Sequence, residues 1–479
     1  MLGLKRNEVK LVSHNPDWNI IAAQIIKQLW KVFGSNAEDI QHIGSTAIRR
    51  IKAKPDMYIA VGVKDMYVSD EFLSRLEEID LVKIENRTEP DSILIVKKSE
   101  IESGVHTLYV HILPYGSSTW NENINFRDYM NDFPQKALSY ENLKISLAEQ
   151  FPNDRRAYKN GKVAFFKEYF IQANIYKEFK QKFDIVNLEP LNKGWSADKK
   201  YIIETVKGEK QLIRIADITE YDRKKAEYGM AERVYNLGVP TPKPIDFGFC
   251  KDGQKVYSIF TWLEGDDAQT ILPHMSESEQ YDIGIKAGKT LRKIHSLPAP
   301  NNAEPWAEWF WRKVQGRIDF YNTNPVKSDS GDILVQYLQE NKHLLDTRPQ
   351  TFNHGDFNAS NLIILPDKQI GVIDFNYYNK DHGDPWWEFD PSMDGWGSEP
   401  SASYITGLIK GYFAGEPPSE FFVMLSYYLA YDALAALCDT SVGEGGGPED
   451  GNQHTENILR WFGNMKNPIP SWYLSDFYV

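Results

Sequence analysis

The stretch that most constrains the fold of this chain is residues 352–389, FNHGDFNASNLIILPDKQIGVIDFNYYNKDHGDPWWEF. A polar segment is followed by two short apolar runs, residues 362–365 and 370–373, which flank a polar turn. Two apolar runs around such a turn predict a β-hairpin. The hairpin would bring Asn361, at the start of one strand, close to Asp374, at the end of the other.

The polar groups of this stretch match the needs of phosphoryl transfer. That reaction requires a carboxylate to orient the attacking hydroxyl and accept its proton, and further oxygen ligands to hold Mg²⁺ against the phosphates. We expect Asp356 to be the catalytic carboxylate, and Asn361 and Asp374 to bind the metal. A hydrophilic turn followed by an ordinary hairpin, as in a non-catalytic binding protein, would have no chemical need for all three groups.

The spacing H-x-D-x-x-x-x-N, the strand that ends in I-D-F and the later segment HGDPWWEF resemble the aminoglycoside phosphotransferase and choline kinase family. The resemblance covers roughly residues 182–479 and implies a bilobal protein-kinase-like fold. It also implies ATP or GTP as the phosphate donor, Mg²⁺ as the metal and a small hydroxyl compound as the acceptor. Members act on aminoglycosides, macrolides, choline or homoserine, so antibiotic resistance is one of the roles implied, and His354 is expected to brace the catalytic loop.

The same resemblance assigns the nucleotide side of the site. A loop over residues 194–200, with Gly194 and Ser196, lies between two predicted strands and would cover the phosphates. Arg214 stands on the following strand, where the family carries a lysine, and would also bind phosphate. On the next predicted helix, Glu227 is expected to face Arg214, with Glu232 as the alternative.

Beyond this helix, the segment that contains Thr261 and Leu263 leaves a predicted hairpin, and its backbone is expected to bind the nucleoside base. The rest of the chain is predicted to be mainly helical, apart from the metal hairpin and a Gly-rich acidic loop over residues 441–453. Residues 381–450 hold 13 Asp or Glu and one basic residue, Lys410. This excess favours a cationic acceptor, for which the expected contributors are Asp390, Asp394, Glu399 and Asp432. A neutral acceptor such as a macrolide or sugar is the alternative.

The first third of the chain carries a separate pattern. A strand-like EVKLVS and an apolar-periodic helix from Trp18 to Phe33 precede the segment HIGSTA…KAKPDMYIAV. A Gly-Ser turn after a strand exposes backbone N–H groups that can bind phosphate. Nucleotidyltransferase folds follow this turn with two acids on a strand, which bind two metals; here Asp56 is present, but the second position is Tyr58.

This segment, with later matches such as FRDY and YENLK, resembles the GrpB family over roughly residues 8–175. The resemblance implies a nucleotidyltransferase-like α/β domain. Because Tyr58 replaces an acid, we expect ligand binding or scaffolding here, with nucleotidyl transfer or nucleotide-dependent ligand binding as alternative functions of the whole protein.

The composition agrees with a soluble enzyme. A net charge of −13 argues against nucleic acid as a partner, and no run of residues has the character expected of a membrane span or signal peptide. Cys250 and Cys438, the only cysteines, form no C-x-x-C motif, which fits a cytoplasmic protein. The oligomeric state is not indicated.

The length of 479 residues predicts more than one domain. We expect an α+β protein: a GrpB-like domain (residues 1–178), then a kinase N-lobe and hinge (179–264), then a kinase C-lobe with the catalytic and metal loops (265–479). The charged segment 178–182 is the predicted helix end and linker.

Overall fold

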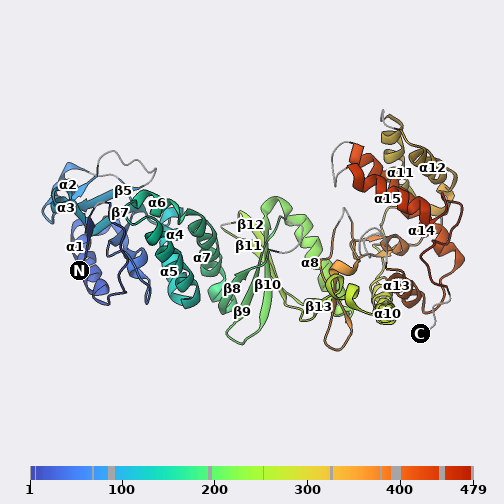
Figure 1. Cartoon of the computed structure of the whole chain (residues 1–479), viewed down its shortest axis with the longest axis horizontal. Coiled ribbons are helices and arrows are strands. Elements are labelled where there is room, and N and C mark those ends of the chain that lie inside the picture. Colours follow the sequence, from blue (N-terminus) through green and yellow to red (C-terminus); the bar gives the residue numbers. More distant parts are fainter. Residues whose placement is uncertain are drawn as a thin grey trace. The chain divides into compact units, whose positions relative to one another are not determined.

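The computed structural model describes residues 2–5, 7–66, 69–84, 92–192, 197–251, 253–323, 327–377, 380–389, 401–441 and 448–475 (Figure 1). The chain separates into two compact units. The first comprises Met1–Leu191 and Tyr201–Glu209, and the second Asn192–Lys200 and Lys210–Val479. Helices and sheets occur in both units, which confirms the predicted α+β class. The predicted domain boundaries at residues 178 and 264 stay predictions.

The first unit contains a five-stranded sheet in the order β2-β3-β7-β5-β4. Its strands are β2 (Ala37–Ile43), β3 (Met57–Val63), β4 (Leu81–Lys83), β5 (Ile93–Lys97) and β7 (Leu108–Pro114). β3 and β7 run parallel and place Tyr58 opposite Tyr109, whereas the other neighbours are antiparallel. β3 is almost entirely buried, which explains why it is a continuous apolar run with no polar alternation.

Helices surround this sheet. They are α1 (Asp17–Phe33), α2 (Asp70–Glu77), α3 (Lys98–Ser103), α4 (Ser118–Asp132), α5 (Pro134–Gln150), α6 (Arg155–Asn160) and α7 (Val163–Phe183). The helix expected from Trp18 is confirmed as α1, which buries Trp18 and Leu29 in the core of the sheet. The strand expected at EVKLVS is wrong: Val12 forms only a single bridge with Ala53. A two-stranded pair, β1 (Leu4–Lys5) with β6 (Val105–His106), completes this part.

The segment 178–182 lies within the last turns of α7, which ends at Phe183. A second sheet follows, in the order β11-β12-β10-β9-β8. Its strands are β8 (Ile185–Pro190), β9 (Lys199–Thr205), β10 (Lys210–Asp217), β11 (Pro244–Cys250) and β12 (Lys255–Thr261). In the second unit, α8 (Tyr221–Asn236) packs on β10, β11 and β12, so one helix covers the strands that carry the nucleotide-side residues.

The rest of the second unit is mainly helical. Its helices are α9 (Ala268–Ile271), α10 (Glu277–Ile294), α11 (Trp306–Thr323), α12 (Asp329–Glu340), α13 (Ala402–Phe413), α14 (Ser419–Ser441) and α15 (Pro448–Trp461). α10 and α13 approach closely because glycines line their contact: a Cβ at Gly288 would overlap the carbonyl oxygen of Leu408, and one at Gly407 that of Tyr281. The backbones therefore touch directly at this crossing.

One helix in the described part of the chain, Ser419–Asp439 within α14, is long and apolar enough to cross a membrane. However, 72% of its apolar window is buried inside the protein, where Leu425 and Tyr427 belong to the main hydrophobic core. The loop expected at residues 441–453 is partly wrong, because α15 already begins at Pro448; residues 442–447 lie outside the described part.

Candidate active site

The loop that carries Asp356, the predicted catalytic residue, lies between β14 (Thr351–Phe352) and β15 (Leu362–Ile364) in the second unit, and we call it the catalytic loop. The Asp356 carboxylate accepts hydrogen bonds from Asn358 Nδ2 at 2.7 Å and from Asn361 Nδ2 at 2.9 Å. Burial raises the pKa of the Asp356 carboxyl above its ordinary value. Each carboxylate oxygen accepts one amide and keeps a further lone pair, so the group is oriented and still able to accept a proton.

His354 braces this loop, as expected. Its Nε2 donates to the carbonyl oxygen of Ile373 at 3.0 Å, while its Nδ1 accepts from the backbone N–H of Asp356 at 3.2 Å. One donating and one accepting nitrogen define the neutral imidazole, and burial lowers the pKa of His354 in the same direction. The ring therefore joins the catalytic loop to the end of the metal hairpin.

Glu388 stabilises the catalytic loop through hydrogen bonds to its backbone. The sequence motifs did not indicate this role. Its carboxylate accepts from the backbone N–H groups of His354 and Gly355 and from His295 Nε2, the last at 2.8 Å. Burial acts to raise the pKa of Glu388, but the hydrogen bond and charge of His295 outweigh it and hold the pKa below its ordinary value. Gly355 has a φ of 88°, and a Cβ there would overlap the carbonyl oxygen of Asn376.

The hairpin predicted between Asn361 and Asp374 is confirmed; its role in metal binding stays a prediction. β15 pairs antiparallel with β16 (Ile370–Val372), and Leu362 lies opposite Val372. The backbone N–H of Ile373 donates to the carbonyl oxygen of Asn361 at 3.0 Å, which places Asn361 beside the residue that precedes Asp374. Asp374 itself has a left-handed backbone, with a φ of 57°, and its side chain is 40% exposed.

These two side chains suit a hard divalent ion. Asn361 uses only its Nδ2, and Asp374 uses only Oδ1 in an ion pair with Arg214, among the described residues. One amide oxygen and one carboxylate oxygen therefore remain for a metal. Mg²⁺ prefers such ligands, and it takes few of them from the protein because phosphates and water complete its shell. Among the described residues, no group of three or more His, Cys, Asp or Glu is arranged to hold a metal ion by itself.

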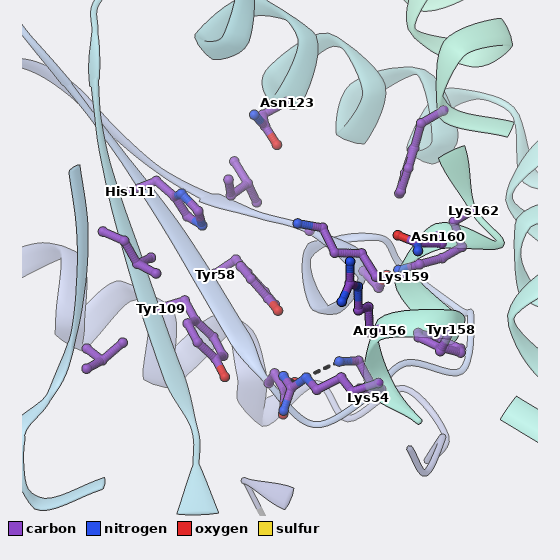
Figure 2. A pocket seen from close by; sticks show the side chains of 18 of the residues that line it. Lys54, Tyr58, Tyr109, His111, Asn123, Arg156, Tyr158, Lys159, Asn160 and Lys162 are labelled. Carbon is purple, nitrogen blue, oxygen red and sulfur yellow. Dashed lines mark hydrogen bonds and ion pairs between the residues drawn. The ribbon is translucent and has the colours of Figure 1, made fainter. Parts of the chain in front are cut away.

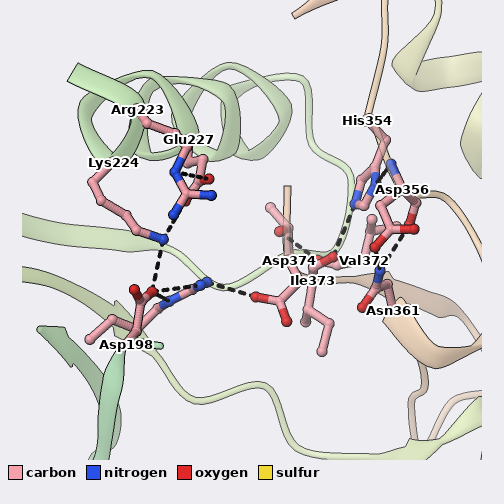
Figure 3. A network of polar contacts seen from close by, with 12 residues as sticks. Asp198, Arg223, Lys224, Glu227, His354, Asp356, Asn361, Val372, Ile373 and Asp374 are labelled. Carbon is pink, nitrogen blue, oxygen red and sulfur yellow. Dashed lines mark hydrogen bonds and ion pairs between the residues drawn. The ribbon is translucent and has the colours of Figure 1, made fainter. Parts of the chain in front are cut away.

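On the predicted nucleotide side of the site, the ion pairs of Arg214 and Glu227 differ from those expected (Figure 3). Arg214 on β10 bridges two carboxylates, Asp374 at 2.6 Å and Asp198 at 3.1 Å. Glu227 does lie inward, with a side chain that is 12% exposed, but its close ion pair is with Lys224 at 3.0 Å, and no pair with Arg214 is present in the described residues. Lys224 also contacts Asp198 at 2.8 Å and thereby links α8 to the loop before β9.

The sequence did not single out Lys224 or Asp198. The i, i+3 spacing of Lys224 and Glu227 was a signal for their pair, but nothing local linked Asp198 to either helix or strand. Arg214 is half-buried; desolvation alone would lower the pKa of its guanidinium, yet the charges of Asp374 and Asp198 raise it. The cation is therefore held firmly by two carboxylates.

The residues predicted to bind the nucleoside base, Thr261 and Leu263, lie at the end of β12 and just after it. Thr261 ends β12, where its N–H donates to the carbonyl oxygen of Lys243 at 2.9 Å, and its Oγ1 accepts from the N–H of Lys243 at 2.8 Å. Leu263 follows and its side chain lies against Gly371 of β16. Gly194 and Ser196 lie outside the described residues.

The acidic region after the metal loop is largely paired where it is described. Five of its carboxylates form ion pairs inside the second unit: Asp381 with Arg233, Asp384 with Arg348, Glu388 with His295, Glu416 with Lys410, and Asp439 with Arg317. Asp432 is half-buried, and its charge acts on Lys313. Asp390, Asp394 and Glu399 lie outside the described residues. The net field of this region is therefore weaker than the count of acids suggests.

Comparison with known proteins agrees with both units. Residues 187–422 match the Phosphotransferase enzyme family, and residues 8–171 match the family described as GrpB protein. Glutamate-rich protein GrpB of Alkalihalophilus pseudofirmus is 36% identical over 169 residues, which are 35% of this chain and 97% of that protein. UPF0157 protein YqkA of Bacillus subtilis is 28% identical over 150 residues, which are 31% of this chain and 42% of that protein.

Solved structures resemble each unit at lower identity. GrpB of Enterococcus faecalis is 24% identical, with a TM-score of 0.32, and covers 34% of this chain and 96% of its own. Aminoglycoside phosphotransferase APH(2'')-Ib with bound ADP is 15% identical, with a TM-score of 0.44, and covers 60% of this chain and 96% of its own. The first part of the chain therefore belongs to the GrpB family, and residues 187–422 match the model of the phosphotransferase enzyme family.

Proposed function

We propose that the second unit is a small-molecule kinase that transfers the γ-phosphoryl group of ATP or GTP to a hydroxyl of a cationic, aminoglycoside-like acceptor in the cytoplasm. The observation that carries this proposal is the geometry around Asp356. Its carboxylate is half-buried, held by two amides and still able to accept a proton. One of these amides belongs to Asn361, and the β15–β16 hairpin joins Asn361 to Asp374.

In this mechanism, Asp356 orients the acceptor hydroxyl and takes its proton as the oxygen attacks phosphorus. His354 and Glu388 keep the loop in place, because each is bonded to its backbone. Asn361 and Asp374 would hold Mg²⁺, which supplies positive charge to the transferred phosphoryl group. Arg214 and the loop over residues 194–200 bind the phosphates, and the backbone between Thr261 and Leu263 binds the base.

The cationic acceptor rests on the acidic excess after the metal loop. Ion pairs inside the second unit reduce this excess, and none of the described pairs reverses its sign. An acidic cleft raises the association rate of cations, and salt screens that effect. The dependence of kcat/KM on salt concentration therefore tests whether the acceptor is cationic.

The test is phosphoryl transfer by the full chain with matched cationic and neutral hydroxyl compounds, each at low and high salt. We expect kcat/KM to be larger for the cationic compounds and to fall with salt for these alone. Asp356→Asn serves as the blank for transfer. Turnover of only neutral acceptors would refute the cationic acceptor, and the absence of transfer to every hydroxyl compound from ATP and from GTP would refute the kinase itself.

A further inference from the structure

The first unit contains a cavity of about 1210 Å³ that the kinase chemistry does not use. Its floor is formed by side chains of β3 and β7, and its opposite wall by α4, α6 and the start of α7 (Figure 2). In Figure 2, Arg156 and Lys159 reach from α6 toward Tyr58 on the sheet. The volume exceeds that of most sites for small ligands, so the cavity can hold a ligand together with water.

The wall of this cavity has an excess of positive charge. Five basic side chains line it, against the two carboxylates of Asp56 and Asp154. Asp154 caps the N-terminus of α6, where it accepts from backbone N–H groups, and Asp56 pairs with Lys54 and Arg155. The other three cations, Arg156, Lys159 and Lys162, have no carboxylate partner among the described residues.

The pKa of Lys162 reflects both its burial and the repulsion from neighbouring cations. Burial, together with the charges of Lys54, Lys159 and Arg155, lowers the pKa of the Lys162 ammonium to about 7. Its ammonium nitrogen lies 4.7 Å from the centroid of the Tyr158 ring and 5.5 Å from that of Phe166. An anion in the cavity would relieve the repulsion among these cations, because each of them would gain an opposite charge.

Asp56 provides a second, independent sign of a ligand. Its side chain is fully buried, and Oδ2 receives both Lys54 and Arg155. Oδ1 has no hydrogen-bond partner among the described residues. Buried carboxylate oxygens are nearly always hydrogen-bonded, so this atom indicates a missing donor such as a hydroxyl group.

A metal-dependent role is disfavoured by the residue beside Asp56. Tyr58 occupies the position of the second metal-binding acid and stacks on Tyr109, with ring centroids 5.0 Å apart. Burial raises the pKa of the Tyr58 hydroxyl, so it stays protonated and is a poor metal ligand. The described residues contain no cluster of three or more metal-binding side chains here.

We propose that this cavity binds a phosphorylated small molecule that also carries a hydroxyl group, and that it does so without a divalent ion. The phosphate contacts Arg156, Lys159 and Lys162, and the hydroxyl donates to Oδ1 of Asp56. This site is separate from the kinase site and does not depend on its activity.

The test is calorimetric titration of the full chain in EDTA with ribose 5-phosphate, pyrophosphate and ribose. We expect ribose 5-phosphate to bind more tightly than ribose, with an affinity that falls as salt rises. Lys159→Ser and Lys162→Met should each weaken binding of ribose 5-phosphate about tenfold. Lys167→Ser, which removes an exposed charge from the same helix as Lys162, is the matched control and should leave binding unchanged.

Three further variants sharpen the result. Asp56→Asn should weaken ribose 5-phosphate more than pyrophosphate, because only the sugar phosphate carries the hydroxyl donor. Asp374→Asn, in the second unit, should leave both affinities unchanged. Lys159 is exposed, so its replacement does not threaten folding. Equal affinities for Lys159→Ser and the Lys167→Ser control, or binding that requires Mg²⁺, would overturn the proposal. Kinase activity in Lys159→Ser should equal that of the parent, so a failed kinase proposal leaves this test intact.

Discussion

The two candidate sites differ in whether their charged side chains have partners of opposite charge. Around the catalytic loop of the second unit, the described cations and carboxylates compensate one another: Arg214 bridges Asp198 and Asp374, and Lys224 bridges Asp198 and Glu227. In the cavity of the first unit, three cations have no carboxylate partner in the described part of the chain, and one buried carboxylate oxygen has no donor.

This difference agrees with the functions that we propose for the two sites. Compensated charges hold polar groups in a fixed geometry, which is what catalysis by orientation and electrostatics requires. Cations that lie close together repel one another, and a ligand of opposite charge removes that repulsion when it binds.

Replacing Asp356 with Asn should have the largest effect, because it removes the proton acceptor and keeps the shape. We expect kcat/KM for phosphoryl transfer to fall by ~10²-fold or more. Nucleotide binding should survive, since Asp356 lies on the acceptor side. In the parent, kcat/KM should decline as pH falls through a pKa that lies above the ordinary value of an Asp, because burial raises it and the ionised form is the base.

Steady-state kinetics and equilibrium nucleotide binding test this prediction together. Asn358→Ala is a useful companion, because it removes one donor and leaves the carboxylate. Turnover at the parent rate in purified Asp356→Asn would contradict the assignment.

Replacing Glu388 with Ala should remove the carboxylate that accepts hydrogen bonds from His295 and from the backbone of the catalytic loop. The change leaves His295 and two loop N–H groups without their acceptor in a buried place. We expect the second unit to lose about 3 kcal/mol of stability, as is typical when one partner of a buried pair is removed. Denaturant unfolding measures this loss; Glu420→Ala, an exposed acid on α14, is the control, and equal stability of the two variants would rule out the bracing role.

Replacing Arg214 with Met should separate the two functions of this cation. Nucleotide affinity should fall by about tenfold because a phosphate contact is lost. Binding of Mg²⁺ without nucleotide should become tighter, since the Asp374 carboxylate no longer shares its charge with Arg214. Titration with Mg²⁺ alone and with nucleotide alone distinguishes these effects, and weaker binding of both would indicate a merely structural role.

The smallest effect concerns Lys144 in the first unit, a buried cation that lies outside the cavity. Its ammonium donates to the carbonyl oxygen of Lys52, and burial lowers its pKa to about 7. A lysine with a lowered pKa destabilises the fold below that pKa, and the penalty fades as pH rises from about 7 toward the ordinary value. Lys144→Met should therefore gain more stability relative to the parent at pH 6 than at pH 9.

Hydrogen exchange of the amides of α5 at both pH values measures this difference locally. Lys167→Met, an exposed replacement, is the control and should show no such dependence on pH. A gain that is the same at pH 6 and pH 9 would show that Lys144 carries no charge penalty.

Sequence reasoning succeeded where contacts are local. The hairpin that joins Asn361 to Asp374 spans few residues, and its alternation of apolar runs and turn chemistry is visible in the chain itself. The helix α1 was likewise visible from its periodicity. By contrast, EVKLVS has the composition of a strand but found no neighbour of matching register, and only Val12 forms a bridge. Strand formation depends on a partner, which composition does not reveal.

Sequence reasoning failed where partners are distant. Glu388 contacts His295 across 93 positions and His354 across 34, so its role as a brace had no local signal. Arg214 was expected to pair with a glutamate on the next helix. Its ion pair with Asp374 instead joins residues 160 positions apart, and Lys224 takes Glu227.

The sequence by itself determined the order of the two families, the catalytic and metal residues proposed here, and the loss of the second acid at Tyr58, because each depends on residue type and short spacing. Only the tertiary structure decided which charges are compensated. Whether a carboxylate meets a cation depends on how separate elements pack, and five acids that looked free in the chain are paired once it folds. The same packing gathers Arg156, Lys159 and Lys162 around one cavity with no carboxylate partner among the described residues, because α6 and the start of α7 face the sheet there.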